Sequence, residues 1–126
     1  MTRVLAAVLA AFTLAGCART EVPSAEEQIR AAATAFIADC ARDDLAAAAD
    51  ILSEAVQEPF IRAGQSGCAG VLGADPAAAR AGAISDLRSE QFATVAIDGG
   101  NSIELERRGE LWYITTSPPP PTPPRR

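Results

Sequence analysis

The chain has 126 residues, of which 48% are apolar, and a formal charge of −5, a size that allows one small domain and excludes a second. All 11 basic residues are arginine, and there is neither histidine nor lysine, which excludes imidazole-dependent catalysis and Schiff-base chemistry. Alanine fills 28 positions, so we expect a modest core despite the apolar fraction.

Residues 1–16 have the order of a secretory signal peptide. Arg3 precedes an apolar run of eleven residues from Val4 to Leu14, and small residues follow it. A helix of that length covers roughly 16 Å against about 30 Å of hydrocarbon in a bilayer, which is too short for a permanent transmembrane helix. The segment Leu14-Ala15-Gly16-Cys17 resembles the lipobox of bacterial lipoproteins; the alternative is an ordinary cleaved signal that leaves a cysteine at the border.

The lipobox resemblance implies that residues 1–16 are removed, that Cys17 carries diacylglycerol, and that residues 17–23 form a lipidated tether. Two or more acyl chains hold a protein stably on a bilayer, so we expect a protein anchored to the outer face of the cell membrane. Its mature form has ten arginines and 16 acidic residues, a formal charge of −6. An acidic domain is not expected to bind nucleic acid.

Cys40 and Cys68 remain as a pair once Cys17 is assigned to lipid. Disulfides persist in exported proteins, so one bridge is predicted; the alternative is two free buried thiols. Their separation of 28 positions and the absence of histidine do not fit a metal site. A bridge of this span stabilises a fold by about 3 to 4 kcal/mol.

The N-terminal part of the domain predicts helices. Ser24 and Glu27 have the spacing of a capping box, and the residues that follow form one apolar stripe at helical spacing: Ile29, Ala33, Phe36, Ile37 and Cys40. Asp43 or Asp44 can cap a second helix. The short joint between the two helices predicts a helical hairpin.

The middle of the chain is more interrupted. Ser53 and Pro59 predict a break near residues 53–58, because an uninterrupted helix would carry the chain too far from Cys40 for Cys68 to return. A short third helix should then run to Gly64. In chain order we next expect a loop at 64–67, a helical turn at 68–72 and, after Asp75-Pro76, a helix at 77–83.

From Gln91 onward, apolar residues alternate with polar or small ones, which is typical of strands joined by turns at 98–101 and 108–110. The last strand, residues 111–116, has apolar residues on both faces and is predicted to lie inside the sheet. Residues 117–126, Ser-Pro-Pro-Pro-Pro-Thr-Pro-Pro-Arg-Arg, predict a disordered, solvated polyproline tail. The alternatives are a stiff arm and a ligand for an aromatic groove.

This order of elements resembles the exported nuclear transport factor 2-like, or cystatin-like, domains of actinobacterial lipoproteins. The resemblance covers most of residues 24–116 and is carried by four segments: the helix with Phe36, Ile37 and Cys40, the run from Asp43 to Ala48, the run from Cys68 to Leu72, and Gly109-Glu110-Leu111-Trp112. It implies an α+β fold in which N-terminal helices pack on a C-terminal curved antiparallel sheet, a small cone with an apolar mouth. Phe36 and Trp112 are the candidate lining of a ligand pocket in that cone.

No residue is expected to be catalytic, and no cofactor or metal is expected. Asp43-Asp44 lack the ligand spacing of a calcium loop, so helix capping explains them better. Glu104, Glu106 and Arg108 share a strand face and fit a solvated outer face of the sheet.

The function expected first is therefore a non-catalytic binding or accessory module with a protein partner in the cell envelope. The alternatives are a carrier of a small apolar ligand and a degenerate isomerase- or dehydratase-like enzyme.

Overall fold

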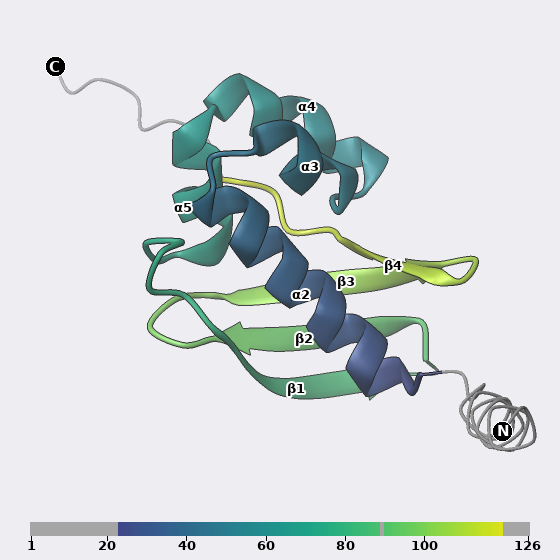
Figure 1. Ribbon diagram of the computed structural model, residues 1–126. Helices are drawn as coiled ribbons and strands as arrows, with labels where there is room; N and C mark the ends of the chain where they lie inside the picture. The colour runs from purple at the N-terminus through teal and green to yellow at the C-terminus, as the bar shows by residue number, and fades with distance from the viewer. Residues whose placement is uncertain (1–22, 89, 120–126) are drawn as a thin grey trace, which may run out of the picture.

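The computed structural model describes residues 23–88 and 90–119. In this part of the chain four helices precede a four-stranded antiparallel sheet, which confirms the predicted α+β class (Figure 1). The elements are α2 Ala25–Ala41, α3 Leu45–Asp50, α4 Glu54–Ala63, α5 Gln65–Leu72, β1 Ala81–Arg88, β2 Phe92–Ile97, β3 Ser102–Arg108 and β4 Leu111–Ile114.

The expected signal peptide at 1–16, the lipidated Cys17, tether residues 17–22 and tail residues 120–126 lie outside the described residues. None of the helices within 23–88 and 90–119 has the length and apolar character needed to cross a membrane.

The first two helices begin where their caps predict. The Ser24 hydroxyl accepts a hydrogen bond from the Glu27 amide at 3.2 Å, and the Asp44 carboxylate accepts one from the Ala47 amide at 3.2 Å. All five residues of the predicted stripe on α2 are buried. Asp43 has a positive φ of 61°, a conformation that Asp tolerates better than most residues, and the chain reverses there from α2 to α3.

The predicted break near residue 53 is confirmed, but Pro59 does not cause it. Ser53 is the N-cap residue of α4, and Pro59 lies inside that helix. The loop predicted at 64–67 is wrong, because α5 already begins at Gln65. Gly64, with a φ of 66°, makes the reversal in one residue, and Gly67 lets α5 approach so closely that a Cβ there would lie 3.0 Å from the Phe60 carbonyl oxygen.

The helix predicted at 77–83 is also wrong. Residues 76–78 form a turn, and β1 starts at Ala81. Its pairing with β2, in which Ala81 faces Ile97 and the Asp98 amide donates to the Arg80 carbonyl at 2.9 Å, satisfies the backbone across the chain. Tertiary pairing thus overrides the helix propensity of an alanine-rich segment.

The sheet is a meander in the order β1-β2-β3-β4. One face supplies most of the sheet's buried residues, and these pair across strands, as in the row Ala93, Leu105 and Ile114. They pack with the buried stripe of α2 into one hydrophobic core. Arg30 of α2 also donates to the carbonyl oxygen of Gly82 in β1, at 3.0 Å.

The predicted inner position of the last strand is wrong, because β4 is an edge strand and Leu111 is 62% exposed. Its outer edge is covered locally by the segment that joins α3 to α4. The Ile114 amide donates to the Ile51 carbonyl, and the Ser53 amide donates to the Ile114 carbonyl, both at 2.9 Å. These bonds occupy backbone groups that an open sheet edge would otherwise present for pairing with another chain.

The predicted disulfide between Cys40 and Cys68 is present, with a Cα–Cα distance of 5.8 Å. It joins the last turn of α2 to the middle of α5. Both cysteines are fully buried, so the bridge ties the two helical parts of the domain together inside the core.

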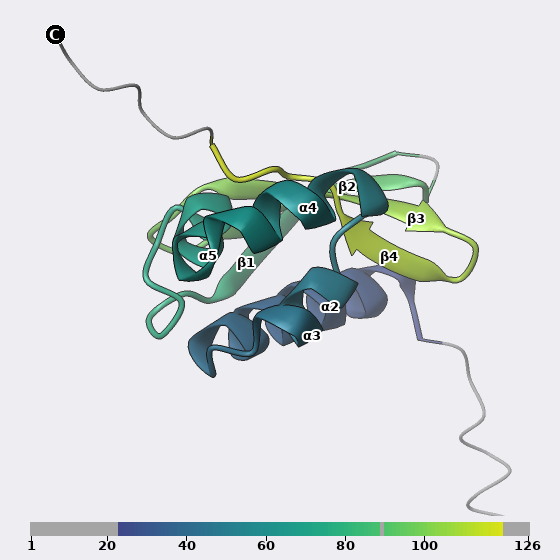
Figure 2. The ribbon, with the colours of Figure 1, turned by 90° about the horizontal axis from the view of Figure 1, so that it is seen from above.

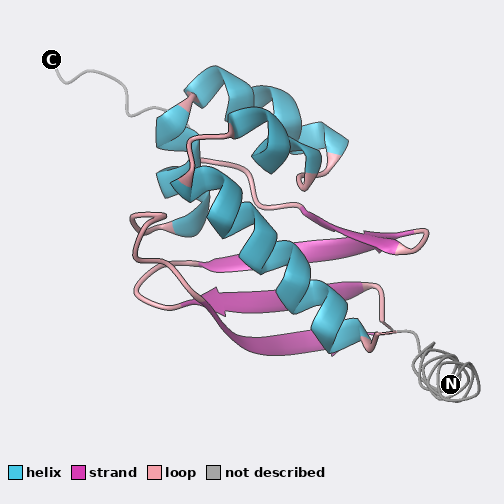
Figure 3. Ribbon diagram, in the orientation of Figure 1, coloured by secondary structure: helices cyan, strands magenta, loops and turns pink. Residues whose placement is uncertain are grey.

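The helices cover only one side of the sheet. Helix α2 crosses one face, α3 and α4 lie beyond the β4 edge, and α5 lies at the end of the sheet by the β2–β3 turn (Figures 1 and 3). The view from above shows the opposite face with no helix over it (Figure 2). After β4 the chain turns over the helices, where Pro118 and Pro119 lie so near Gly70 that a Cβ there would be 3.0 Å from the Pro119 Cδ. The start of the tail therefore contacts α5, with Ser117 and Pro119 exposed, and the solvated tail stays a prediction for residues 120–126, which lie outside the described residues.

Candidate binding surface

The face of the sheet that no helix covers is called the outer face. It carries a row of four side chains, called the aromatic row after its two rings. In register across the strands, Arg88 pairs with Phe92, Phe92 with Glu106 and Glu106 with Tyr113. The row lies one residue out of step with the buried row that contains Leu105. Because successive side chains of a strand point to opposite faces, these four point away from the core.

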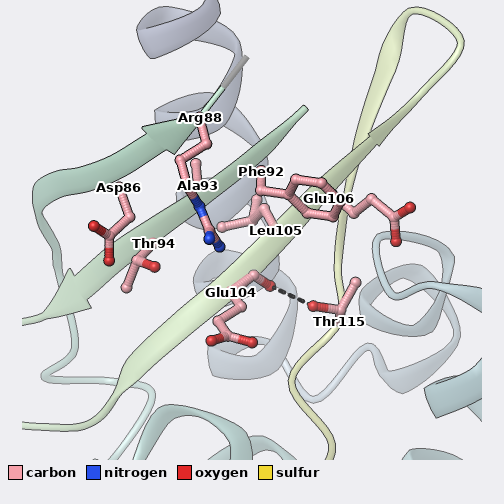
Figure 4. Close-up of a pocket in the computed structure, with 9 residues that line it drawn as sticks. All are labelled: Asp86, Arg88, Phe92, Ala93, Thr94, Glu104, Leu105, Glu106 and Thr115. Carbon is pink, nitrogen blue, oxygen red and sulfur yellow. Dashed lines mark hydrogen bonds between the residues drawn. The ribbon is translucent and has the colours of Figure 1, made fainter. Parts of the chain in front are cut away.

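A cleft of about 300 Å³ opens on this face (Figure 4). Its lining comes from β1, β2, β3 and the segment just after β4: Asp86, Arg88, Phe92, Ala93, Thr94, Glu104, Leu105, Glu106 and Thr115. At one side, the Thr115 hydroxyl donates to the Glu104 carbonyl at 3.3 Å and the Glu104 amide donates to the Thr116 hydroxyl at 2.8 Å. These bonds hold the segment after β4 against β3 and make one wall of the cleft.

An irregular stretch of β1 shapes the opposite wall. The register between β1 and β2 shifts between Ser85 and Arg88, and Asp86 has a φ of 51°. Such bulges redirect side chains, and here both Asp86 and Arg88 line the cleft.

Phe92 and the charged groups give the cleft its chemistry. Phe92 is 46% exposed, and the Arg88 guanidinium carbon lies 5.9 Å from the centroid of its ring, within the range of a cation–π contact. Asp86, Glu104 and Glu106 outnumber Arg88 in the lining, so the formal charge of the cleft is −2. An exposed aromatic ring beside surplus carboxylates suits a partner that is both apolar and cationic.

Two further clefts are present in the described part of the chain. One of about 290 Å³ at the β4 edge is lined by Leu52, Ser53, Glu54, Gln57, Arg108 and Tyr113. The other, of about 540 Å³, lies between α4, the start of α5 and the start of the tail, and is lined by Pro59, Arg62, Ala63, Ser66, Ser117, Pro118 and Pro119. Tyr113 thus belongs both to the aromatic row and to the edge cleft.

The two residues predicted to line a ligand pocket lie in the core. Phe36 is fully buried against Phe60, with ring centroids 5.7 Å apart, and Trp112 is 5% exposed. Neither lines any of the three clefts described above. Their rings fill the interior between helices and sheet, where the predicted pocket would have been.

The prediction that Glu104 and Arg108 lie on a solvated face is confirmed by their exposure, and Glu106 is half-buried beside them. Phe92 was missed, although it carried a signal: it is out of phase with Val95 and Ile97, which alternate toward the core. Asp86 and Arg88 were missed because residues 77–83 were expected to be helical and no strand was expected at 81–88.

No charged side chain of the described residues is buried. Asp44 acts as a helix cap, as predicted, and no group of three or more metal-ligating side chains occurs within 23–88 and 90–119. Ser53 is the single buried polar residue of these ranges. Among them, therefore, no carboxylate is enclosed in the apolar core.

Searches of protein-family models, curated proteins and solved structures found no match to this chain.

Proposed function

We propose that this protein is a lipid-anchored extracytoplasmic accessory module that works by binding through the outer face of its sheet. The observation that carries the proposal is the uncovered face itself, with the exposed ring of Phe92 at a cleft of about 300 Å³. An open face is common in antiparallel sheets, but on this one an exposed aromatic ring, carboxylates and an arginine converge on one cleft, a combination that suits binding. The lipobox-like sequence at residues 14–17 supports the anchoring.

The charge distribution supports binding over catalysis. The carboxylates of the cleft lie on an open surface together with an arginine, whereas general acids and bases usually work in enclosed sites that shift their pKa. The alternative of a carrier for a small apolar ligand requires an enclosed apolar space, and the rings of Phe36 and Trp112 occupy the space between helices and sheet. A binding surface requires neither an enclosed acid–base site nor an enclosed apolar space.

We also propose that the domain is a reduced relative of the nuclear transport factor 2-like domains. The support is the order of elements, helices first and an antiparallel meander last, together with the resemblance of residues 24–116. In this proposal the function has moved from the interior of a cone to the outer face of the sheet.

Site-specific photo-crosslinking in the living host tests the binding function. A photoreactive phenylalanine analogue at Phe92 should give a discrete adduct in the membrane fraction. Ile61, which is 58% exposed on α4, is the matched control position and should give none. Equal adducts at both positions, or none at Phe92, would overturn the proposal. A turnover that Glu104→Gln abolishes without unfolding the domain would replace it with an enzyme.

A further inference from the structure

The outer face is complementary in charge and apolar character to a segment of this same chain. The proline-rich segment 117–126 ends in Arg125-Arg126, and the cleft on the outer face has an exposed aromatic ring and a formal charge of −2. Polyproline segments bind surfaces lined by aromatic rings, and flanking arginines pair with carboxylates. We propose that the outer face binds the proline-rich tail of a second copy of this chain.

The spacing of the aromatic row fits a polyproline helix. Phe92 and Tyr113 are separated by one strand, with Glu106 between them in register. Two interstrand spacings amount to about 9.5 Å, and three residues of polyproline helix span about 9.3 Å. Prolines three positions apart in the tail, such as Pro121 and Pro124, therefore match the two rings when the tail runs across the strands.

The carboxylates lie where the arginines of such a tail can reach them. Glu106 lies between the two rings, and Glu104 is two residues along the same strand, about 7 Å away. Arg88 already stacks near Phe92 at 5.9 Å, so the tail's guanidinium groups are directed to the glutamates while its proline rings contact the aromatic rings. Glu106 already lies 3.8 Å from the Arg108 guanidinium, whereas Glu104 makes no ion pair within the described residues, so Glu104 is the first carboxylate that a tail arginine would meet.

The position at which the described chain ends favours the tail of a second copy over the molecule's own tail. Pro119 lies against Gly70 of α5, and α5 touches the β2–β3 turn, at the end of the sheet opposite to the start of β2 (Figure 1), where Phe92 is the first residue. The seven following residues include four prolines, and a polyproline helix of that length extends about 22 Å without reversing. To reach its own Phe92, the tail of one molecule would have to fold back along the length of the sheet, so the tail of a second copy is the favoured occupant and the contact is head-to-tail.

The test is a mixed-sample NMR experiment on the chain from residue 17 onward, with Cys17→Ser to prevent acylation. One batch is labelled with nitrogen-15. The other is unlabelled and carries a spin label at Thr122→Cys, which leaves every proline and arginine of the tail in place. The expected result is intermolecular broadening of the amide signals of Phe92, Thr94, Glu104 and Glu106.

Matched variants test the two parts of the contact. Phe92→Ala in the nitrogen-15 chain should raise the concentration needed for half-maximal broadening about tenfold, and Arg125→Ser with Arg126→Ser in the spin-labelled chain about fivefold, more at low salt. Ile61→Ala, at an exposed apolar site on α4, should change nothing. The dispersed amide spectrum of each variant checks that it is folded.

Absence of broadening at the outer face in the mixed sample overturns the inference. So does broadening that persists only when one diluted molecule carries both labels, because its own tail is then the occupant. The inference rests on the proposed function only in using the same face. Crosslinking of an envelope protein at Phe92, combined with no intermolecular broadening, would retain the proposed function and reject this inference.

Discussion

Gly100→Ala should destabilise the domain strongly, because the turn between β2 and β3 touches the end of α5. The Asn101 amide donates to the Leu72 carbonyl at 2.8 Å. A Cβ on Gly100 would lie 2.2 Å from that same carbonyl oxygen, which is part of the backbone and cannot rotate away. The turn must shift, and the hydrogen bond to Leu72 is then lost.

The magnitude follows from two contributions. Forcing extra volume into a packed contact costs about 1 to 3 kcal/mol, and the lost hydrogen bond costs about 0.5 to 1.5 kcal/mol. The free energy of unfolding should therefore fall by about 1.5 to 4.5 kcal/mol, measured by urea denaturation followed by circular dichroism. For a domain of this size each kcal/mol lowers Tm by about 4 to 8 °C.

Gly99→Ala is the matched control in the same turn. Gly99 has a φ of 76° and open space around its Cα, so alanine there brings only backbone strain of about 1 kcal/mol. The difference between the two variants isolates the close approach to Leu72. If Gly100→Ala unfolds at the same urea concentration as Gly99→Ala, the contact between the turn and α5 does not exist in solution.

Three further outcomes are expected. Cys40→Ala and Cys68→Ala should each lower the free energy of unfolding by about 3 to 4 kcal/mol in urea denaturation, and the double variant by no more, since either change removes the same bridge; additive losses would contradict a shared bond. Asp44→Ala should cost about 1 kcal/mol through loss of the cap on α3, measured by thermal denaturation, and an unchanged Tm would show that the cap contributes nothing. Cys17→Ser should remove diacylglycerol and release or misprocess the protein, measured by intact mass and membrane fractionation; a wild-type mass without lipid would refute the anchoring.

Local features of this chain were predictable because each depends on neighbours in sequence. The cap at Ser24, the buried stripe of α2 and the cap at Asp44 follow from residues three or four positions apart. The alternation of Val95 and Ile97 toward the core is equally local. The disulfide was predictable for a different reason, because assigning Cys17 to lipid left two cysteines to pair.

The path of residues 77–88 was decided by the tertiary structure. Alanine and a proline at the first helical position favour a helix there, but pairing with β2 offers backbone hydrogen bonds such as that from the Asp98 amide to the Arg80 carbonyl. No local pattern reveals a partner 18 residues away.

The candidate site depends on the same pairing of β1 with β2. Asp86 and Arg88 reach the cleft only once β1 joins the sheet, and Phe92 stays exposed because α2 covers the other face. Sequence periodicity shows that a strand has two faces, but which of them the helices cover depends on packing between segments far apart in the chain.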